Sequence, residues 1–361
     1  MPYDRTADSS SAADPRSVPG SETKARIRAE LAGPFEWPTS LMRATMPLQD
    51  LSAVMDLGRL ANVAAATNNR GELIFTLISK EYIQTGLNWI YAMHRLGLNN
   101  FLVIAGDKFT SETLDQRGIA SVRADIDESE FDPSFMSNDG FSAKGLAMIA
   151  LKFPVTSFLL KYGYSVIFSD SDAIWLRDPM GYMGDADIAF QRVAHHPPSV
   201  SSLWGFAACT GFIFFRHGAK TIAFLDRCII EHQSFRCDQV AMNLALLEGD
   251  PSWLCEDAGW MPPSGDVRYD KDQRLAVFAR LIKFPMKGKF LQGGLRLLAL
   301  PHDKFWRHLW VARAMADMVI CHPNSPKNDL EKMNILDAIG VRFPPRAVDL
   351  TPGGGRDQGG D

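Results

Sequence analysis

The sequence has few cysteines, no long apolar run and no surplus of charge of either sign. Its five cysteines are scattered without a C-x-x-C pair, which argues against a disulfide framework and against a zinc knuckle. Lys and Arg together number 38, against 42 Asp and Glu. Because proteins that bind nucleic acid usually carry a basic surplus or a basic patch, we expect no nucleic acid among the partners.

The sequence also shows no segment that would direct it to a membrane. Residues 1–20, MPYDRTADSSSAADPRSVPG, are polar and rich in helix breakers, unlike a signal peptide. No run approaches the roughly 20 apolar residues that cross a bilayer. We therefore expect a chain without a membrane span, which as given would be cytoplasmic.

The composition predicts one folded domain between two tails. Apolar residues make up 46% of the chain and charged residues 22%, as in folded soluble proteins. Residues 1–35 are rich in Ser, Ala, Asp and Pro without periodicity, which indicates a disordered tail, and residues 349–361 are a glycine-rich, flexible one. No repeat or low-complexity linker interrupts residues 36–348, so we expect a single domain there.

Apolar patterning indicates an α/β fold with a sheet of mixed direction. A continuous apolar run at 73–78 is typical of a strand buried on both faces. A helical pattern at 82–96, closed by Gly97, and a second strand at 101–105 complete a β-α-β unit with parallel strands. The further elements that we expect are strands at 120–123, 164–169, 186–191, 209–216 and 318–321, and helices at 238–248 and at 143–162, the latter interrupted at Pro154.

The most informative motif is a pair of acids, Asp170 and Asp172, directly after the strand at 164–169. Ligands of open α/β sheets bind beyond the carboxyl ends of the strands. In extended chain, positions two apart point to the same side, so both carboxylates could face one ion. Carboxylate oxygens suit Mg²⁺ or Mn²⁺. A pair of solvated acids in a turn is the alternative, which the apolar flanks disfavour.

Two enzyme classes place D-x-D after an apolar strand. One is the phosphatases and phosphotransferases that use the first Asp as a nucleophile, which here would be Asp170. Their pattern usually continues with Thr where this sequence has Ile174, and it stands at the first strand of the domain, whereas two strands precede it here. The other class is the nucleotide-sugar glycosyltransferases, whose D-x-D holds a metal on the diphosphate. Its position in the chain favours the second class.

Four segments in the same order resemble the glycosyltransferases of family 77, a group of nucleotide-diphospho-sugar transferases. They are KYGYSVIFSDSDAIWLRDP, CTGFIFFR, CDQVAMNLAL and MVICHPNSPKNDLEKM. The resemblance spans residues 73–332 and implies a GT-A fold, with a mixed, mostly parallel sheet flanked by helices. It further implies a metal-dependent enzyme, using Mn²⁺ or Mg²⁺, that moves a sugar from a nucleotide-diphosphate sugar, such as a UDP-sugar, to a glycan or other hydroxyl acceptor with retention.

The resemblance also implies roles for individual residues. Asp170, Asp172 and His322 would be the metal ligands. Asp238 and Gln239 would face the sugar and the acceptor, and Lys332, with Lys327 as its rival, would neutralise charge on the diphosphate. The residues implied for binding the nucleotide sugar are Thr76, Ile78, Asp107, Lys152, Ser171 and Gly211.

The sequence departs from the family pattern in two places. An aromatic residue usually follows shortly after the histidine, where this chain has His322-Pro323-Asn324-Ser325. Membrane-anchored members carry an N-terminal span, so a Golgi-lumen location applies if an anchor is missing from this chain.

Two points remain from the sequence. His195 and His196, followed by two prolines, indicate a loop and not a metal site. A non-catalytic relative that binds nucleotide sugars or glycans stays open as a further alternative.

Overall fold

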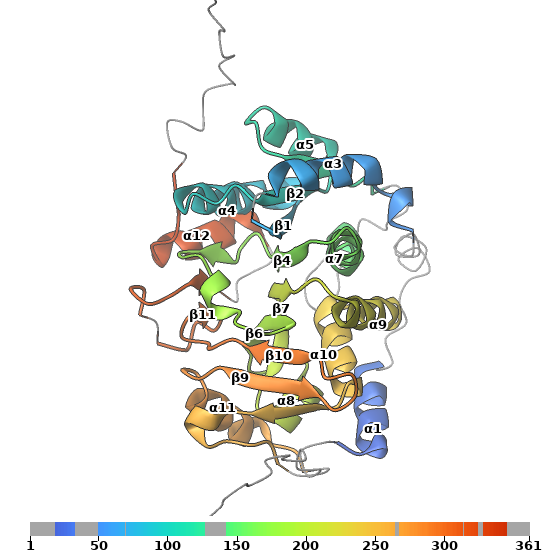
Figure 1. Ribbon diagram of the computed structural model, residues 1–361. Coiled ribbons are helices and arrows are strands. Elements are labelled where there is room, and N and C mark those ends of the chain that lie inside the picture. Colours follow the sequence, from blue (N-terminus) through green and yellow to red (C-terminus); the bar gives the residue numbers. More distant parts are fainter. Residues whose placement is uncertain are drawn as a thin grey trace, which may run out of the picture.

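The computed structural model describes residues 19–32, 50–68, 70–126, 142–263, 267–312, 314–323 and 328–344. Within these ranges one large sheet runs through the molecule with helices on both faces (Figure 1). The strand order is β3-β2-β1-β4-β7-β6-β10-β9-β8. The expected tail at 349–361 lies outside the described residues, and the single-domain boundary stays a prediction.

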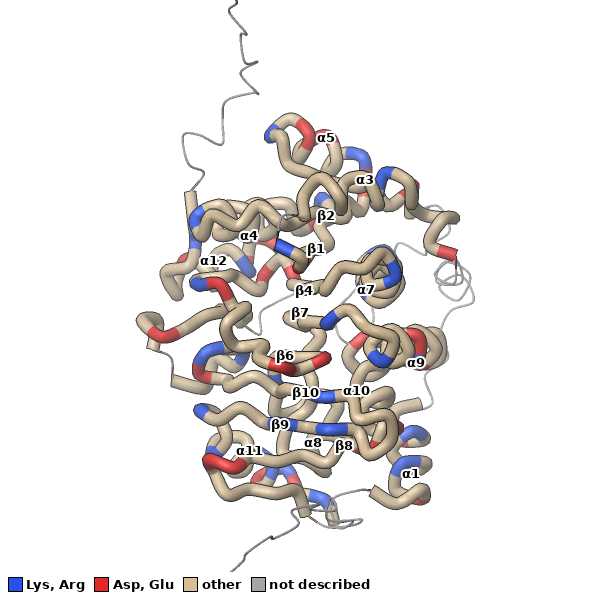
Figure 2. The backbone as a smooth tube through the Cα atoms, viewed as in Figure 1, with Lys and Arg blue, Asp and Glu red and all other residues tan. Residues whose placement is uncertain are grey.

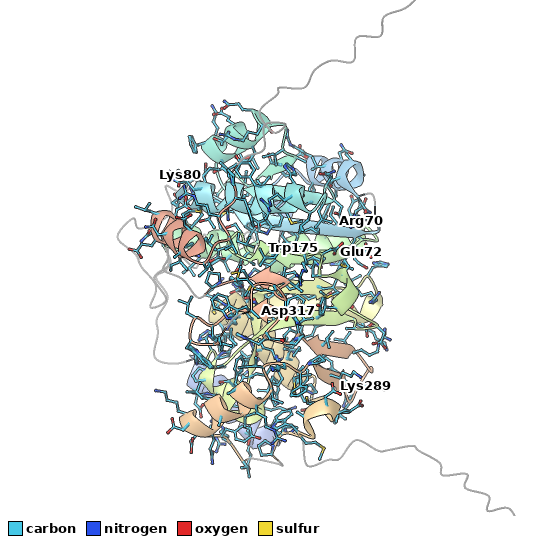
Figure 3. All side chains as sticks on the ribbon, turned by 90° about the vertical axis from the view of Figure 1, so that its left-hand side faces the viewer. Arg70, Glu72, Lys80, Trp175, Lys289 and Asp317 are labelled. Carbon is cyan, nitrogen blue, oxygen red and sulfur yellow. The ribbon has the colours of Figure 1, made fainter. Side chains whose placement is uncertain are left out.

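One half of the sheet is parallel. It consists of β1 (Glu72–Ile78), β2 (Phe101–Ala105), β3 (Ser121–Arg123) and β4 (Ser165–Ser169). All three junctions between these strands are parallel, as the β-α-β pattern predicted. Consequently the carboxyl ends of these strands meet at one edge. Figure 3 shows the direction of β1, since Arg70 and Glu72 lie at its beginning and Lys80 lies beyond its far end.

The other half is mostly antiparallel. It consists of β7 (Ala207–Phe215), β6 (Ile188–Val193), β10 (Arg296–Ala299), β9 (Met286–Phe290) and β8 (Pro251–Leu254). Of the junctions from β4 to β8, only β6–β10 is parallel. The sheet is therefore mixed, as predicted, but parallel and antiparallel junctions occur in equal shares. Because β7 runs against β4, the beginning of β7 lies beside the end of β4.

A small sheet completes the described strands. It pairs β11 (Phe305–Trp306) with β12 (Ile320–Cys321), and β12 with β5 (Ile174–Trp175). The segment after the acidic pair is thus joined to the chain just before His322. Trp175 of β5 is labelled near the middle of the view in Figure 3.

Two apolar clusters fill the space on the two faces of the large sheet. On one face α4 and α12 lie side by side, and on the other α7, α9 and α10 cover the sheet (Figure 1). The helices are α1 (Ser21–Ala32), α3 (Leu57–Thr67), α4 (Ile83–Arg95), α5 (Lys108–Asp115), α6 (Ala143–Ala150), α7 (Lys152–Lys161), α8 (Pro198–Trp204), α9 (Ala219–Phe235), α10 (Asp238–Glu248), α11 (Lys271–Arg280) and α12 (Asp329–Ala338).

The prediction of a disordered tail over 1–35 is wrong for the part that forms α1. Ile27 of this helix is fully buried, and Arg28 forms an ion pair of 2.7 Å with Glu231 of α9. The segment is polar overall, so composition suggested disorder. One buried isoleucine and three ion pairs distant in sequence, Lys24–Asp250, Arg28–Glu231 and Glu30–Arg268, hold it against the domain.

The expected interruption of the helix at 143–162 lies at Leu151 and not at Pro154. Pro154 lies in the first turn of α7. The N–H groups of a first turn have no acceptor within the helix, so the missing N–H of proline costs no hydrogen bond. The combined segment Ala143–Lys161 is the one helix in the described part of the chain that is long and apolar enough to cross a membrane, and 83% of its most apolar window is buried inside the protein. Such burial is typical of a core helix.

Charged residues are spread over the outside of the molecule. In the view of Figure 2, positions of Lys and Arg are interspersed with positions of Asp and Glu along the described chain.

Candidate active site

A cavity of about 460 Å³ opens at the edge where the parallel strands end. Leu77 lines it from β1, Ser79 and Asp170 from just beyond the ends of β1 and β4, and Gly211 from β7. It therefore lies where ligands of open α/β sheets bind, beyond the carboxyl ends of the strands. Most of the predicted site residues meet here: Lys152, Asp170, Ser171, Asp172, Gly211, Asp238, Gln239, His322 and Lys332.

The acidic pair lies in a tight turn and not in extended chain. The N–H of Ala173 donates to the carbonyl of Asp170 at 2.9 Å, and the N–H of Asp170 donates to the carbonyl of Gly211 at 2.7 Å. The alternation argument for the two side chains was therefore wrong in its geometry. The turn nevertheless brings both carboxylates to one place.

Asp170, Asp172 and His322 form a cluster, here called the acidic trio, in which one ligand atom of each lies within 4.8 Å of the others. His322 Nε2 lies 3.6 Å from Asp170 Oδ2 and 3.3 Å from Asp172 Oδ1. Burial and Arg307 act to lower the pKa of His322, but Asp172 outweighs them and raises it. The trio thus favours positive charge at its centre.

Gln191 sets the orientation of the His322 ring. Its amide nitrogen donates to the carbonyls of Phe305 at 2.9 Å and Trp306 at 3.1 Å, which leaves Oε1 to face His322 Nδ1 at 2.8 Å. Nδ1 then carries a hydrogen, so Nε2 is the ring nitrogen that faces the carboxylates and would supply its lone pair to a metal bound there. Two carboxylate oxygens and one imidazole nitrogen are a donor set that fits a divalent cation such as Mn²⁺.

Gly211 is required by the trio. A Cβ atom at this position would lie 2.6 Å from Asp170 Oδ2 and 2.8 Å from His322 Nδ1, and closer still to His322 Cε1. Only glycine lets the backbone of β7 approach these side chains so closely. The resemblance implied that Gly211 binds the nucleotide sugar; in this structure its backbone lies against the side chains of Asp170 and His322.

Two lysines bind the acids of the cavity. Buried Lys152 pairs with Asp238, lies 3.7 Å from Asp170 Oδ1 and donates to the carbonyl of Thr210 at 3.0 Å. Burial acts to lower the pKa of Lys152, but Asp170 and Asp238 raise it, so it stays charged. Lys332 pairs with Asp172; burial acts to raise the pKa of Asp172, yet Lys332 and His322 hold it well below its usual range.

Asp238 and Gln239 occupy the first turn of α10, and Cys237 is the N-cap residue. Burial acts to raise the pKa of Asp238, but Lys152 lowers it, so this carboxylate stays ionised. Gln239 donates its side-chain amide to the carbonyl of His196 at 2.6 Å. Both residues line the cavity beside the trio.

Three predicted residues do not line the cavity. Thr76 and Ile78 are buried, and Ile78 packs against α4, because alternate residues of β1 face opposite sides. Leu77 and Ser79 take the expected place. Asp107 caps α5, accepting from the N–H groups of Thr110 and Lys80, each at 2.8 Å. Burial acts to raise the pKa of Asp107, but these bonds lower it.

Several lining residues carried no recognisable sequence signal. Arg307 and His308 follow β11, and Tyr82 precedes α4, each without a motif around it. For His195 and His196 the sequence indicated only a loop, and both residues line the cavity. Lys327, the rival of Lys332, lies outside the described residues.

The comparisons with known proteins agree on one family. The family model described as nucleotide-diphospho-sugar transferase matches residues 96–336. Arabinosyltransferase RRA1 of Arabidopsis thaliana is 26% identical over 217 residues, which cover 54% of this chain and 51% of that protein. Arabinosyltransferase RRA2 of Arabidopsis thaliana is 27% identical over 179 residues, covering 49% and 38%. The chain thus spans about half, or less, of the length of these curated relatives.

Among solved structures, the apo form of mouse xyloside xylosyltransferase 1 superposes with a TM-score of 0.34 and 9% identity, covering 49% of this chain and 82% of that one.

Proposed function

Because the chain belongs to the nucleotide-diphospho-sugar transferase family and is therefore a glycosyltransferase, we propose that it is a metal-dependent enzyme of the GT-A type. It transfers a sugar from a nucleotide-diphosphate sugar, a UDP-sugar by our inference, to a hydroxyl group of a glycan, and it retains the anomeric configuration. The two curated relatives are named arabinosyltransferases, so a pentose is the first sugar to test.

The observation that carries this proposal is the acidic trio at the centre of the cavity. Asp170, Asp172 and His322 would hold Mn²⁺ or Mg²⁺, with Gln191 orienting the imidazole. When bound, such an ion supplies positive charge that stabilises a departing diphosphate. Lys332, paired with Asp172, brings a second positive charge to the same place.

The lining of the cavity includes two groups of residues besides the trio. Towards the end of β1 the cavity is lined by Leu77, Ser79 and Tyr82, an apolar and aromatic surface without formal charge, which suits a nucleobase and ribose. Towards β6 and α10 it is lined by His195, Asp238 and other polar groups. We assign the transferred sugar and the acceptor to this second part.

Asp238 is the carboxylate that we assign to the sugar. It stays ionised because Lys152 binds it, so it can accept hydrogen bonds from sugar hydroxyls or stabilise positive charge that develops on the sugar. Gln239, held by the carbonyl of His196, lies next to it and can fix the orientation of the sugar or of the acceptor.

A release assay tests the proposal. Purified protein is incubated with UDP-arabinose, UDP-xylose, UDP-glucose and UDP-galactose, each with Mn²⁺, with Mg²⁺ and with a chelator, and free UDP is measured. We expect turnover of at least one donor with metal, none with chelator, and a loss of about 100-fold or more in Asp172→Asn. Equal turnover with metal and with chelator would contradict the metal role.

The same protein distinguishes the alternatives. A phosphatase would form a phosphoenzyme at Asp170 with a phosphate-monoester substrate, which mass spectrometry of a quenched reaction would detect. A binding protein without catalysis would bind UDP with Mn²⁺ in calorimetry and release none from any donor. Either result would replace the transferase proposal.

A further inference from the structure

Arg307 is the cationic side chain of the cavity that the sequence did not indicate. It follows β11 and lines the cavity beside the trio. Its Nη1 donates to the backbone carbonyl of His322 at 3.3 Å, and its Nε is buried without a hydrogen-bond partner in the described part of the chain. The guanidinium is thus anchored at a metal-ligand residue of the trio, and the rest of its donor fork is uncommitted.

The charge of Arg307 is uncompensated within the described residues. Lys152 pairs with Asp238 and lies near Asp170, and Lys332 pairs with Asp172. No described carboxylate lies within ion-pair distance of Arg307. The positive charge of Arg307 acts on a neighbouring histidine. Burial lowers the pKa of His308 to about 3, and the nearby charges of His195 and Arg307 lower it further.

The formal charges of the cavity indicate which ligand group Arg307 could neutralise. Among the described lining residues, Asp170, Asp172 and Asp238 face Lys152 and Lys332. With a divalent cation on the trio, one positive charge is left over, and Arg307 adds a second. The diphosphate of a nucleotide sugar carries two negative charges. The complex is therefore neutral with Arg307, and it carries one uncompensated negative charge without it.

We propose that Arg307 binds the diphosphate of the donor, as a second cation beside Lys332; this inference rests on the proposed function. Lys332 reaches the trio through Asp172, and Arg307 reaches it through the backbone of His322. A planar guanidinium can form two parallel hydrogen bonds to phosphate oxygens, which an ammonium group cannot. Arg307 then holds the leaving group in a fixed orientation.

Calorimetry with UDP and with uridine, each in the presence of Mn²⁺, tests the proposal. Because the two probes differ only in the diphosphate, the ratio of their affinities isolates the phosphate contacts. We expect Arg307→Gln to weaken UDP binding by about 10- to 100-fold and to change uridine binding by less than about twofold. Arg307→Lys keeps the charge without the fork, and we expect an intermediate loss.

The matched control is Arg117→Gln, which removes the same charge from an exposed residue outside the cavity lining and should leave both affinities unchanged. Binding of Mn²⁺ alone, followed by electron paramagnetic resonance, should be unaffected in Arg307→Gln. A parallel loss of Mn²⁺ binding would overturn the proposal, because Arg307 would then act by positioning His322.

Two further results have separate meanings. If Arg307→Gln binds UDP normally but loses affinity for the acceptor, the anionic group belongs to the acceptor and the inference fails. If the unmodified protein binds UDP no more tightly than uridine with Mn²⁺, the proposed function itself fails. The two failures are therefore distinguishable.

Discussion

Oε1 of Gln191 lies 2.8 Å from Nδ1 of His322, and the amide that carries it is fixed by two backbone carbonyls. This relationship decides which nitrogen of the ring faces Asp170 and Asp172. A residue of β6, outside the acidic trio, therefore controls the chemistry of the trio.

The first prediction concerns this contact. Gln191→Leu removes the acceptor for the Nδ1 hydrogen, so the ring can rotate or change tautomer, and we expect Mn²⁺ affinity to fall by about 10- to 100-fold. Titration of Mn²⁺ followed by electron paramagnetic resonance measures it. Gln191→Glu, which still accepts from Nδ1, should lose less. Unchanged Mn²⁺ affinity in the leucine variant, with thermal unfolding intact, would show that Gln191 does not orient the ligand.

The second prediction concerns Gly211. Gly211→Ala places a methyl group against Asp170 and His322, so we expect Mn²⁺ binding and UDP release to fall below detection. The matched control is Gly181→Ala, because a methyl group there would meet nothing within 4 Å. An alanine variant at Gly211 that binds Mn²⁺ as the unmodified protein does would disprove the close approach.

The third prediction concerns the buried pair of Lys152 and Asp238. Lys152→Met leaves carboxylates without their partner, so we expect the free energy of unfolding to fall by about 3 kcal/mol. The double variant with Asp238→Asn should recover part of this loss. Urea unfolding of both single variants and the double variant completes the cycle. Simple additivity of the two single effects would argue against the pair.

The fourth prediction concerns His302, which accepts hydrogen bonds from the N–H groups of Arg307 and His308, both at 3.2 Å. Burial, with the nearby charges of His308 and Arg192, lowers its pKa to about 2. The unfolded chain, with a histidine pKa of about 6.5, then binds more protons than the folded one between these values. Below pH 6.5 the free energy of unfolding therefore falls as pH falls, by about 1.4 kcal/mol per pH unit from this residue.

Urea unfolding between pH 7 and pH 5 measures this slope. His302→Gln keeps an acceptor at the end of the side chain and does not titrate, so it should reduce the slope by about 1.4 kcal/mol per pH unit, while His308, whose pKa burial lowers to about 3, keeps its own contribution. The control His217→Gln alters an exposed histidine and should leave the slope in place. An identical slope in His302→Gln and in the unmodified protein would show that His302 is not the group responsible.

The fifth prediction concerns α1. Ile27 is fully buried, so Ile27→Ala should lower the free energy of unfolding by about 3 kcal/mol through lost packing. Exposed Arg26→Ala is the control from the same helix and should change it by less than about 0.5 kcal/mol. If the two variants unfold alike, α1 does not pack on the domain in solution.

The sequence was sufficient to predict the elements around the site. The apolar run before Asp170 and the β-α-β unit before it locate the carboxyl edge of the parallel strands, and Asp170, Asp172 and His322 do meet there. The choice between Thr76 and Leu77 could not be made, because β1 is apolar on both faces and gives no alternation. For this reason the sequence indicated Thr76 and Ile78, which face the opposite side of β1 from the cavity-lining Leu77.

Other parts of the site depend on contacts distant in sequence. Gln191 and Arg307 stand in segments without a motif, and only the packing of β6 and β11 brings them to His322. The turn at the acidic pair was missed because it is closed by hydrogen bonds, one of them donated by the N–H of Asp170 to the carbonyl of the distant Gly211. The apolar and polar pattern of a short segment gives no information on hydrogen bonds to residues distant in sequence.

The small sheet affects the order in which the residues of the metal centre come together during synthesis. β5, which follows Asp172, pairs only with β12 in the described sheet, and β12 in turn supports β11 and the residues after it. During synthesis both aspartates leave the ribosome long before His322 and Lys332, although Lys152 precedes them. The nascent domain can form its parallel strands early, yet it stays without a complete binding centre until the last strand is added. Any fragment that stops before Phe305 would contain Asp170 and Asp172 but lack His322 and Lys332, so it would have no complete metal centre.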